Sequence, residues 1–217
     1  MKSRMSIAAM WLLALAPLVL VAVCYSRLPD QVPMHWGIDG AVDRYGSKNE
    51  LWAMGALGPV LALLFQFLPR LDPKRRSYEK FRKYYEATAV VIVAFLAVMM
   101  GIVLVEVFRP GTVSVGRVVS ALVGLLLLFL GNLMGKVKTN FFLGIRTPWT
   151  ISDPDVWNRT QRLGGALFFL SGLATIASAL LLPEAVTFWV LLAGVLAAAL
   201  IPIVMSCLWY RKRRREE

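Results

Sequence analysis

The chain has 217 residues, of which 58% are hydrophobic and 17% are charged, and its formal net charge is +11. An ordinary soluble domain carries about 25% charged residues, so this composition excludes a typical soluble domain. A single histidine and two cysteines also leave little material for a zinc site or a disulfide framework.

Six segments are apolar over about 20 residues, the length that crosses a bilayer. They are residues 5–25, 51–68, 85–107, 118–134, 163–182 and 186–209. We therefore predict an all-α integral membrane protein with six transmembrane helices and a single membrane domain, 1–217. Because the connections are short, sequential helices should pack antiparallel.

The Lys and Arg residues predict the orientation, because cytoplasmic flanks of membrane helices are enriched in them. If both termini are cytoplasmic, 19 of the 24 basic residues lie on the inner side and 5 on the outer side. The positive charge then reflects topology and attraction to anionic lipid headgroups. Direct nucleic-acid binding is disfavoured, because no basic face with interleaved aromatics forms a domain.

The first helix resembles a signal peptide, since Lys2 and Arg4 precede its apolar run. That run is longer than a signal-peptide core of about 7–15 residues. The stretch 21–24 weakly resembles a lipoprotein cleavage site, but Val23 stands where a small residue is needed. We expect the helix to be retained, with a kink at Pro17 that neighbouring helices accommodate.

Residues 27–50 form a polar segment that we expect to be a compact extracytoplasmic cap. Its proline and glycine residues are incompatible with a regular helix. The Asp39-Gly40 pair is typical of a hairpin or turn. Trp36 suits the membrane interface, where aromatic rings meet headgroups.

His35 is the only histidine, and two interpretations are open. It could join cap carboxylates in a zinc site, or Asp39 and Asp43 could hold a hard cation. We favour a histidine that forms hydrogen bonds within the cap, with no metal and no cofactor. A Ser-His-Asp set would have to use His35, and no elbow motif is present, so we expect no catalytic residue and no enzyme.

The membrane segments carry few internal charges. Glu86, Glu106, Arg117 and Arg162 all fall near segment ends, which disfavours an ion-coupled transporter. Small residues predict close helix approach in the fourth and fifth helices. They are Gly124, Gly131 and Gly135 in the fourth, and Gly164, Gly165 and Gly172 in the fifth.

Residues 136–162 form the second polar segment, a cytoplasmic loop before the fifth membrane helix. Thr147 before Pro148 and Asp153 before Pro154 are both candidate helix caps. A helix that starts at Pro154 places Trp157, Gln161 and Gly164 along one side.

Arg146 lies in this loop beside Thr147-Pro148 and Trp149. An arginine can pair through two nitrogens with a carboxylate or phosphate. Two interpretations are open. Arg146 could clamp Asp153, Asp155 or carbonyls at a helix end, or it could dock a partner or lipid headgroup.

The two polar segments resemble a known family. Residues 33–37, Pro-Met-His-Trp-Gly, with Gly40, Asp43, Gly46 and Lys48, resemble the domain of unknown function 1648. Residues 140–150, with Val156, Trp157 and Thr160, resemble the hallmark of the SdpI family. The resemblance extends over nearly the whole chain in order, length and helix number.

The resemblance implies a multi-pass immunity protein of the bacterial plasma membrane. Such a protein protects against a secreted membrane-active peptide and can hold a small transcriptional repressor at the membrane. Its expected partners are membrane lipids, a hydrophobic toxin peptide outside and the repressor inside. The alternative is a membrane enzyme, or a lipid or small-molecule transporter, that uses the outer cap and the Arg146 loop. The candidate binding residues are His35, Trp36, Gly37, Gly40, Asp43, Gly46, Lys48, Asn140, Gly144, Arg146, Thr147, Pro148, Trp149 and Trp157.

Overall fold

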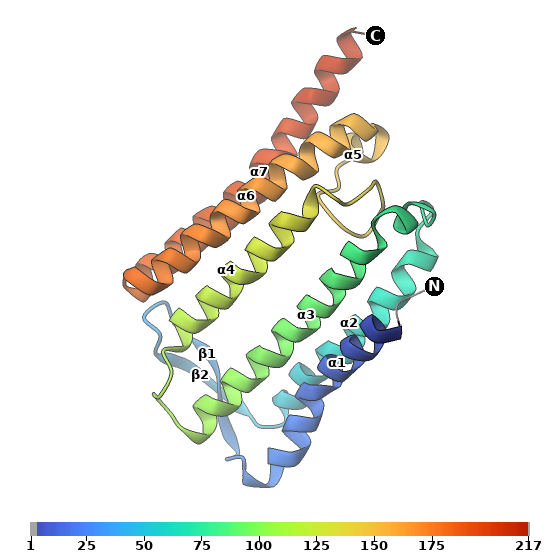
Figure 1. Ribbon diagram of the computed structural model, residues 1–217. Coiled ribbons are helices and arrows are strands. Elements are labelled where there is room, and N and C mark those ends of the chain that lie inside the picture. Colours follow the sequence, from blue (N-terminus) through green and yellow to red (C-terminus); the bar gives the residue numbers. More distant parts are fainter. Residues whose placement is uncertain (1–3, 217) are drawn as a thin grey trace.

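The computed structural model describes residues 4–216 and is a bundle of long helices with a small β-hairpin at one end (Figure 1). The long helices are α1 (Arg4–Cys24), α2 (Glu50–Leu71), α3 (Ser77–Phe108), α4 (Val115–Met134), α6 (Pro154–Leu181) and α7 (Glu184–Glu216). The short elements are a 3₁₀ turn (Tyr25–Arg27), strands β1 (Gln31–Trp36) and β2 (Val42–Ser47), and helix α5 (Pro148–Ser152).

The predicted six-helix membrane fold is confirmed. Within residues 4–216, six helices are long and apolar enough to cross a membrane. Many large apolar side chains point away from the protein, as in Leu12, Leu180 and Leu181, which are 75%, 71% and 80% exposed. Such residues suit contact with lipid tails, because apolar surface in a membrane has no water to avoid.

The C-terminal end of α2 differs from the prediction near Pro69. The second predicted segment ends at residue 68, directly before this proline, yet α2 continues to Leu71. A proline at this position leaves the carbonyl of Phe65, four residues earlier, without its helical N–H donor. The hydroxyl of Tyr85 on α3 donates to that carbonyl at 2.9 Å, so the helix continues without an unsatisfied acceptor.

The start of α3 also differs from the prediction. The third predicted membrane segment begins at residue 85, whereas α3 begins at Ser77 and includes the basic residues before Tyr85. One residue inside it, Phe81, is non-helical, with φ −129° and ψ 19°. Phe81 is fully buried, so its packing holds the kink in place.

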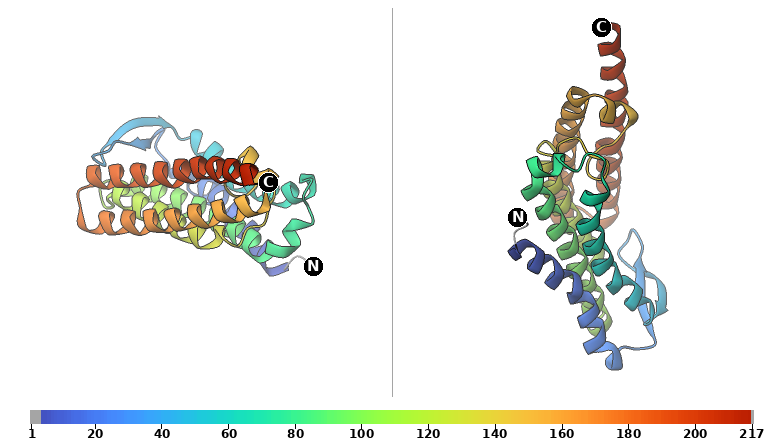
Figure 2. Two further views of the ribbon diagram at one scale, coloured as in Figure 1. Left: turned by 90° about the horizontal axis from the view of Figure 1, so that it is seen from above. Right: turned by 90° about the vertical axis from the view of Figure 1, so that its right-hand side faces the viewer.

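The bundle has two lobes, one of α1, α2 and α3 and one of α4, α6 and α7 (Figures 1 and 2). Glycines bring α4 and α6 together, as predicted. A Cβ on Gly131 would lie 2.6 Å from the carbonyl oxygen of Gly165, and one on Gly165 would lie 2.7 Å from that of Gly131. Gly124 and Gly172 form a second pair of the same kind, at 2.9 and 2.5 Å.

The bundle has two distinct ends. The hairpin end holds β1, β2 and the α6–α7 connection; the loop end holds the first and last described turns, the α2–α3 connection and the α4–α5 loop, residues 135–147 (Figure 1). A cluster containing Val32, Leu51 and Met100 joins the hairpin to the first lobe. At the loop end, Phe81 and Trp157 lie in one cluster that joins the two lobes.

Candidate functional site

The α4–α5 loop is organised by Asn140, whose side chain is fully buried. Its Oδ1 accepts hydrogen bonds from the backbone N–H groups of Phe142 at 2.8 Å and Leu143 at 2.6 Å. Its Nδ2 donates to the carbonyls of Lys138 and Leu143, both at 2.9 Å. Both ends of the carboxamide are therefore used, and a single side chain shapes the turn.

Asp72, in the α2–α3 connection, ties this loop to the other lobe. It is 2% exposed and accepts from the backbone N–H of Phe141 and from the hydroxyl of Tyr78, both at 2.8 Å. The Tyr78 hydroxyl also lies 3.3 Å from Oδ1 of Asn140. Neither Asp72 nor Tyr78 was predicted as a site residue, although Asp72 before Pro73 is typical of a turn.

Helix α6 contacts the loop from the opposite side through the residues predicted to share one of its faces. Gln161 accepts from the N–H of Ile145 at 3.0 Å and donates to its carbonyl at 2.8 Å. Trp157 donates from its indole nitrogen to the carbonyl of Val137 at 2.9 Å. Gly144 has φ +103°, and a Cβ there would lie 2.7 Å from Gln161, so both backbone and space require glycine.

The two predicted helix caps are both formed. Thr147 caps α5 in a capping box with Thr150, and Pro148 follows at the first helical position. Asp153 caps α6 by accepting from the N–H groups of Asp155 and Val156 at 2.7 and 3.1 Å. The Thr147 hydroxyl also lies 3.1 Å from that of Ser206, which fixes α5 against α7.

Arg146 does not clamp Asp153 or Asp155, so that version of the clamp is wrong. Its Nη1 donates to the carbonyl of Phe141 at 2.6 Å, and the residue is exposed. Arg213 of α7 pairs with both carboxylates instead, with its Nε 3.1 Å from Asp153. The last turns of α7, which stays helical to Glu216, bring Arg213 there, and the loop sequence alone does not reveal this.

The cap is an antiparallel hairpin whose turn contains the predicted Asp39-Gly40 pair. His35 forms the predicted hydrogen bond within the cap, with Nδ1 2.6 Å from Oδ1 of Asp43 on the facing strand. Gly40 has φ +79°, the left-handed conformation that favours glycine. Among the described residues, no group of three His, Cys, Asp or Glu residues could hold a metal ion.

The base of the hairpin is anchored to the first lobe. Lys48 pairs with Asp30 at 2.9 Å and lies over the ring of Tyr25, 5.2 Å from its centre. Trp36 is half-buried against the apolar cluster at the hairpin end. A Cβ on Gly46 would lie 2.3 Å from the Glu50 carboxylate, so this glycine leaves room for the start of α2.

The tip of the hairpin reaches the second lobe. A Cβ on Gly40 would lie 2.3 Å from the carboxylate of Glu184, which begins α7. Gly116 on α4 is equally close to that carboxylate, and Glu184 also accepts a hydrogen bond from Ser114. The hairpin therefore spans both lobes, just as Asp72 and Asn140 join them at the loop end.

The predicted site residues thus fall into two groups. His35, Trp36 and Lys48 belong to the hairpin end, and Asn140 and Arg146 to the loop end. Trp149, on α5, is half-buried at the loop end as well. The two groups occupy opposite ends of the bundle, so the membrane separates them in any spanning arrangement (Figure 1).

Comparison with known proteins matches each polar segment separately. The SdpI/YfhL protein family profile matches residues 136–206, and that of the domain of unknown function DUF1648 matches residues 12–58. The chain is 20% identical to the immunity protein SdpI of Bacillus subtilis over 190 residues, which are 88% of either protein. It is 35% identical to an uncharacterized protein of Archaeoglobus fulgidus over 68 residues, 31% of this chain and 35% of that protein. No solved structure matches the chain.

Proposed function

The chain belongs to the SdpI/YfhL family, and from this membership we propose that it is an immunity protein of the bacterial plasma membrane. It protects the cell that makes it from a secreted, membrane-active peptide. The observation that carries this proposal is the similarity to the Bacillus subtilis immunity protein, which extends over 88% of both chains. Both polar segments fall within matched family regions.

The hairpin is the surface on which the peptide binds in this proposal. It supports the role because it is ordered and anchored at both its base and its tip, so little conformational freedom is lost when a ligand binds. Apolar side chains are available on it: Ile38 is 51% exposed and Tyr45 is 60% exposed. The paired His35 and Asp43 add exposed polar groups beside them.

The loop end is the signalling surface in the same proposal, where a small repressor binds from the cytoplasm. Arg146 supports this role because its side chain is exposed and Nη1 forms a single hydrogen bond to the carbonyl of Phe141, which leaves further N–H groups on the guanidinium. The guanidinium can bind a carboxylate of a partner through two nitrogens.

The alternative, a membrane enzyme or transporter that uses the cap and the Arg146 loop together, has less support. The two groups lie at opposite ends of the bundle and cannot form one site (Figure 1). An enzyme or transporter would therefore need a site built from one end only.

The test is a survival assay in a sensitive bacterial strain that lacks any relative of this protein. Cells carry the gene or an empty vector and are exposed to membrane-active peptides secreted by the organism from which the gene is taken. Immunity predicts survival and a maintained membrane potential only with the gene. Equal killing in both strains, with abundant protein in the membrane, would contradict the proposal.

Variants of Arg146 test the signalling part. A lysine can replace the single hydrogen bond to Phe141, so Arg146→Lys should reach wild-type abundance, but it lacks the planar fork. Loss of membrane co-fractionation with a small DNA-binding protein encoded beside the gene, in both Arg146→Lys and Arg146→Ala, supports partner binding. Full co-fractionation in the alanine variant would show that Arg146 does not bind the repressor.

A further inference from the structure

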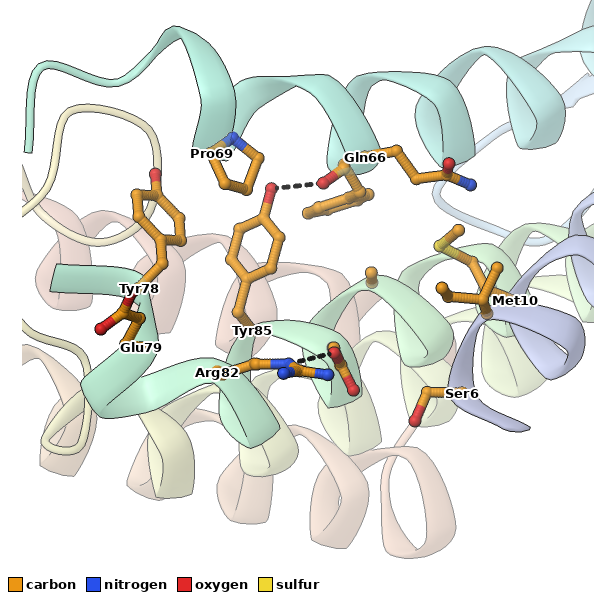
Figure 3. Close-up of a pocket in the computed structure, with 12 residues that line it drawn as sticks. Ser6, Met10, Gln66, Pro69, Tyr78, Glu79, Arg82 and Tyr85 are labelled. Atoms are coloured by element: carbon orange, nitrogen blue, oxygen red, sulfur yellow. Dashed lines mark hydrogen bonds and ion pairs between the residues drawn. The ribbon is translucent and has the colours of Figure 1, made fainter. Parts of the chain in front are cut away.

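A cavity lies between α1, α2 and α3 near the loop end, and Tyr78, whose hydroxyl donates a hydrogen bond to Asp72, forms part of its wall. Its volume is about 270 Å³. Figure 3 shows Met10 of α1 and Gln66 of α2 facing Tyr85 and Arg82 of α3 across it. Most of its surface is apolar, and its size exceeds that of a 150 Å³ cavity that binds benzene.

One polar atom in the wall lacks a hydrogen bond. The side-chain nitrogen Nε2 of Gln66 is buried and, within residues 4–216, has no acceptor. Buried polar groups are normally hydrogen-bonded, so an unpaired donor at a cavity points to a ligand that carries an acceptor oxygen. A hydrocarbon alone would leave this donor unsatisfied.

The rim of the cavity carries charges of both signs. Arg82 pairs through Nε with Glu86 at 2.8 Å, which leaves its two terminal nitrogens to donate elsewhere. Glu79 lies one turn before Arg82, is exposed and forms no ion pair with any residue that the structure describes. Residues three apart on a helix are neighbours, with Cβ atoms about 5–6 Å apart. A ligand whose cation and anion are joined by a short linker can therefore bind Glu79 with its cation and Arg82 with its anion.

We propose that this cavity binds a phospholipid with a primary ammonium headgroup, such as phosphatidylethanolamine. One acyl chain lies against Met10 and Phe65, and an ester carbonyl accepts the hydrogen bond of Gln66. The phosphate binds Arg82 and the ammonium binds Glu79. The site is independent of the proposed immunity function, because no residue of the hairpin or the α4–α5 loop contributes to it.

Native mass spectrometry of the full chain in a mild detergent tests the site. The protein is delipidated and given equal amounts of phosphatidylethanolamine, phosphatidylglycerol and phosphatidylcholine. The wild type should retain one phosphatidylethanolamine several-fold more than either other lipid, since phosphatidylglycerol lacks an ammonium and phosphatidylcholine has no N–H donor. Equal retention of the three lipids would overturn the proposal without any variant.

Variants assign the contacts. Glu79→Gln should abolish the preference for phosphatidylethanolamine, and Gln66→Leu should lower retention of all three lipids several-fold. Lys80→Gln removes a charge from the same turn outside the cavity and is the matched control, with no expected change. A preference that survives Glu79→Gln, in protein whose helix content and thermal unfolding match the wild type, would also overturn the assignment.

Discussion

Replacing Gly131 by alanine should force α4 and α6 apart. The new methyl group would lie 2.6 Å from the carbonyl oxygen of Gly165 and 2.6 Å from the backbone nitrogen of Phe169. Both obstacles are backbone atoms of a long helix, so they cannot rotate away. Gly101 on α3 is the matched control, because a Cβ there meets nothing within 4 Å.

The magnitude follows from two opposing terms. Overpacking of a tight contact costs about 1–3 kcal/mol. Alanine is a better helix former than glycine by about 0.5–1 kcal/mol, and this gain is common to both variants. The variants should therefore differ by the overpacking cost. At roughly 2–4 °C per kcal/mol for a protein of this size, Gly131→Ala should unfold about 2–12 °C below Gly101→Ala.

Thermal unfolding of both purified variants in the same detergent measures this difference. A second measurement, cross-linking of cysteine pairs placed on the lipid-exposed edges of α4 and α6, reports their separation directly. If the two variants unfold at the same temperature, the glycine pair does not set the α4–α6 distance, and the packing argument fails.

Three further predictions concern the loop end and the orientation. Asn140→Ala removes four hydrogen bonds inside the loop and should lower the free energy of unfolding by about 2–4 kcal/mol, with faster protease cleavage between α4 and α5. The control variant, Asn132→Ala at an exposed position, should unfold like the wild type. Arg213→Gln should release the end of α7 from Asp153 and Asp155, which is measured as faster amide exchange there. High salt should have the same effect on the wild type. Unchanged exchange would exclude these ion pairs as the contact that holds the end of α7. In a cysteine-free background, an impermeant thiol reagent should label His35→Cys in intact cells and Arg146→Cys only after permeabilisation, and the reverse pattern would invert the predicted orientation.

Features encoded over short stretches of the chain were predictable from sequence. Apolar runs of bilayer length located the six long helices, and Thr147-Pro148 and Asp153-Pro154 predicted where α5 and α6 begin. The Asp39-Gly40 pair predicted the hairpin. Each of these signals depends on neighbouring residues, so no tertiary information was needed.

Contacts between distant parts of the chain were not predictable. Asp72 and Phe141 are far apart in sequence, and nothing in either local pattern links a turn carboxylate to a loop N–H. The sixth predicted membrane segment ends at residue 209, yet α7 stays helical to Glu216 and places Arg213 against Asp153. The interpretation that Arg146 clamps Asp153 or Asp155 is wrong for the same reason, because Arg213 from another helix pairs with both carboxylates.

The division into two lobes has a consequence for biosynthesis. The chain leaves the ribosome from its N-terminus, and units that can pack alone fold first. Helices α1, α2 and α3 share an apolar cluster of Met10, Ala62 and Val93, so this half can assemble while the rest is still being made. Its buried carboxylate, Asp72, accepts a further hydrogen bond from the backbone N–H of Phe141, which is synthesised later. Until that amide is made, Asp72 has only its hydrogen bonds from Tyr78 and Lys74 within the first lobe. A chain truncated after α4, before Phe141, therefore leaves this carboxylate one hydrogen bond short.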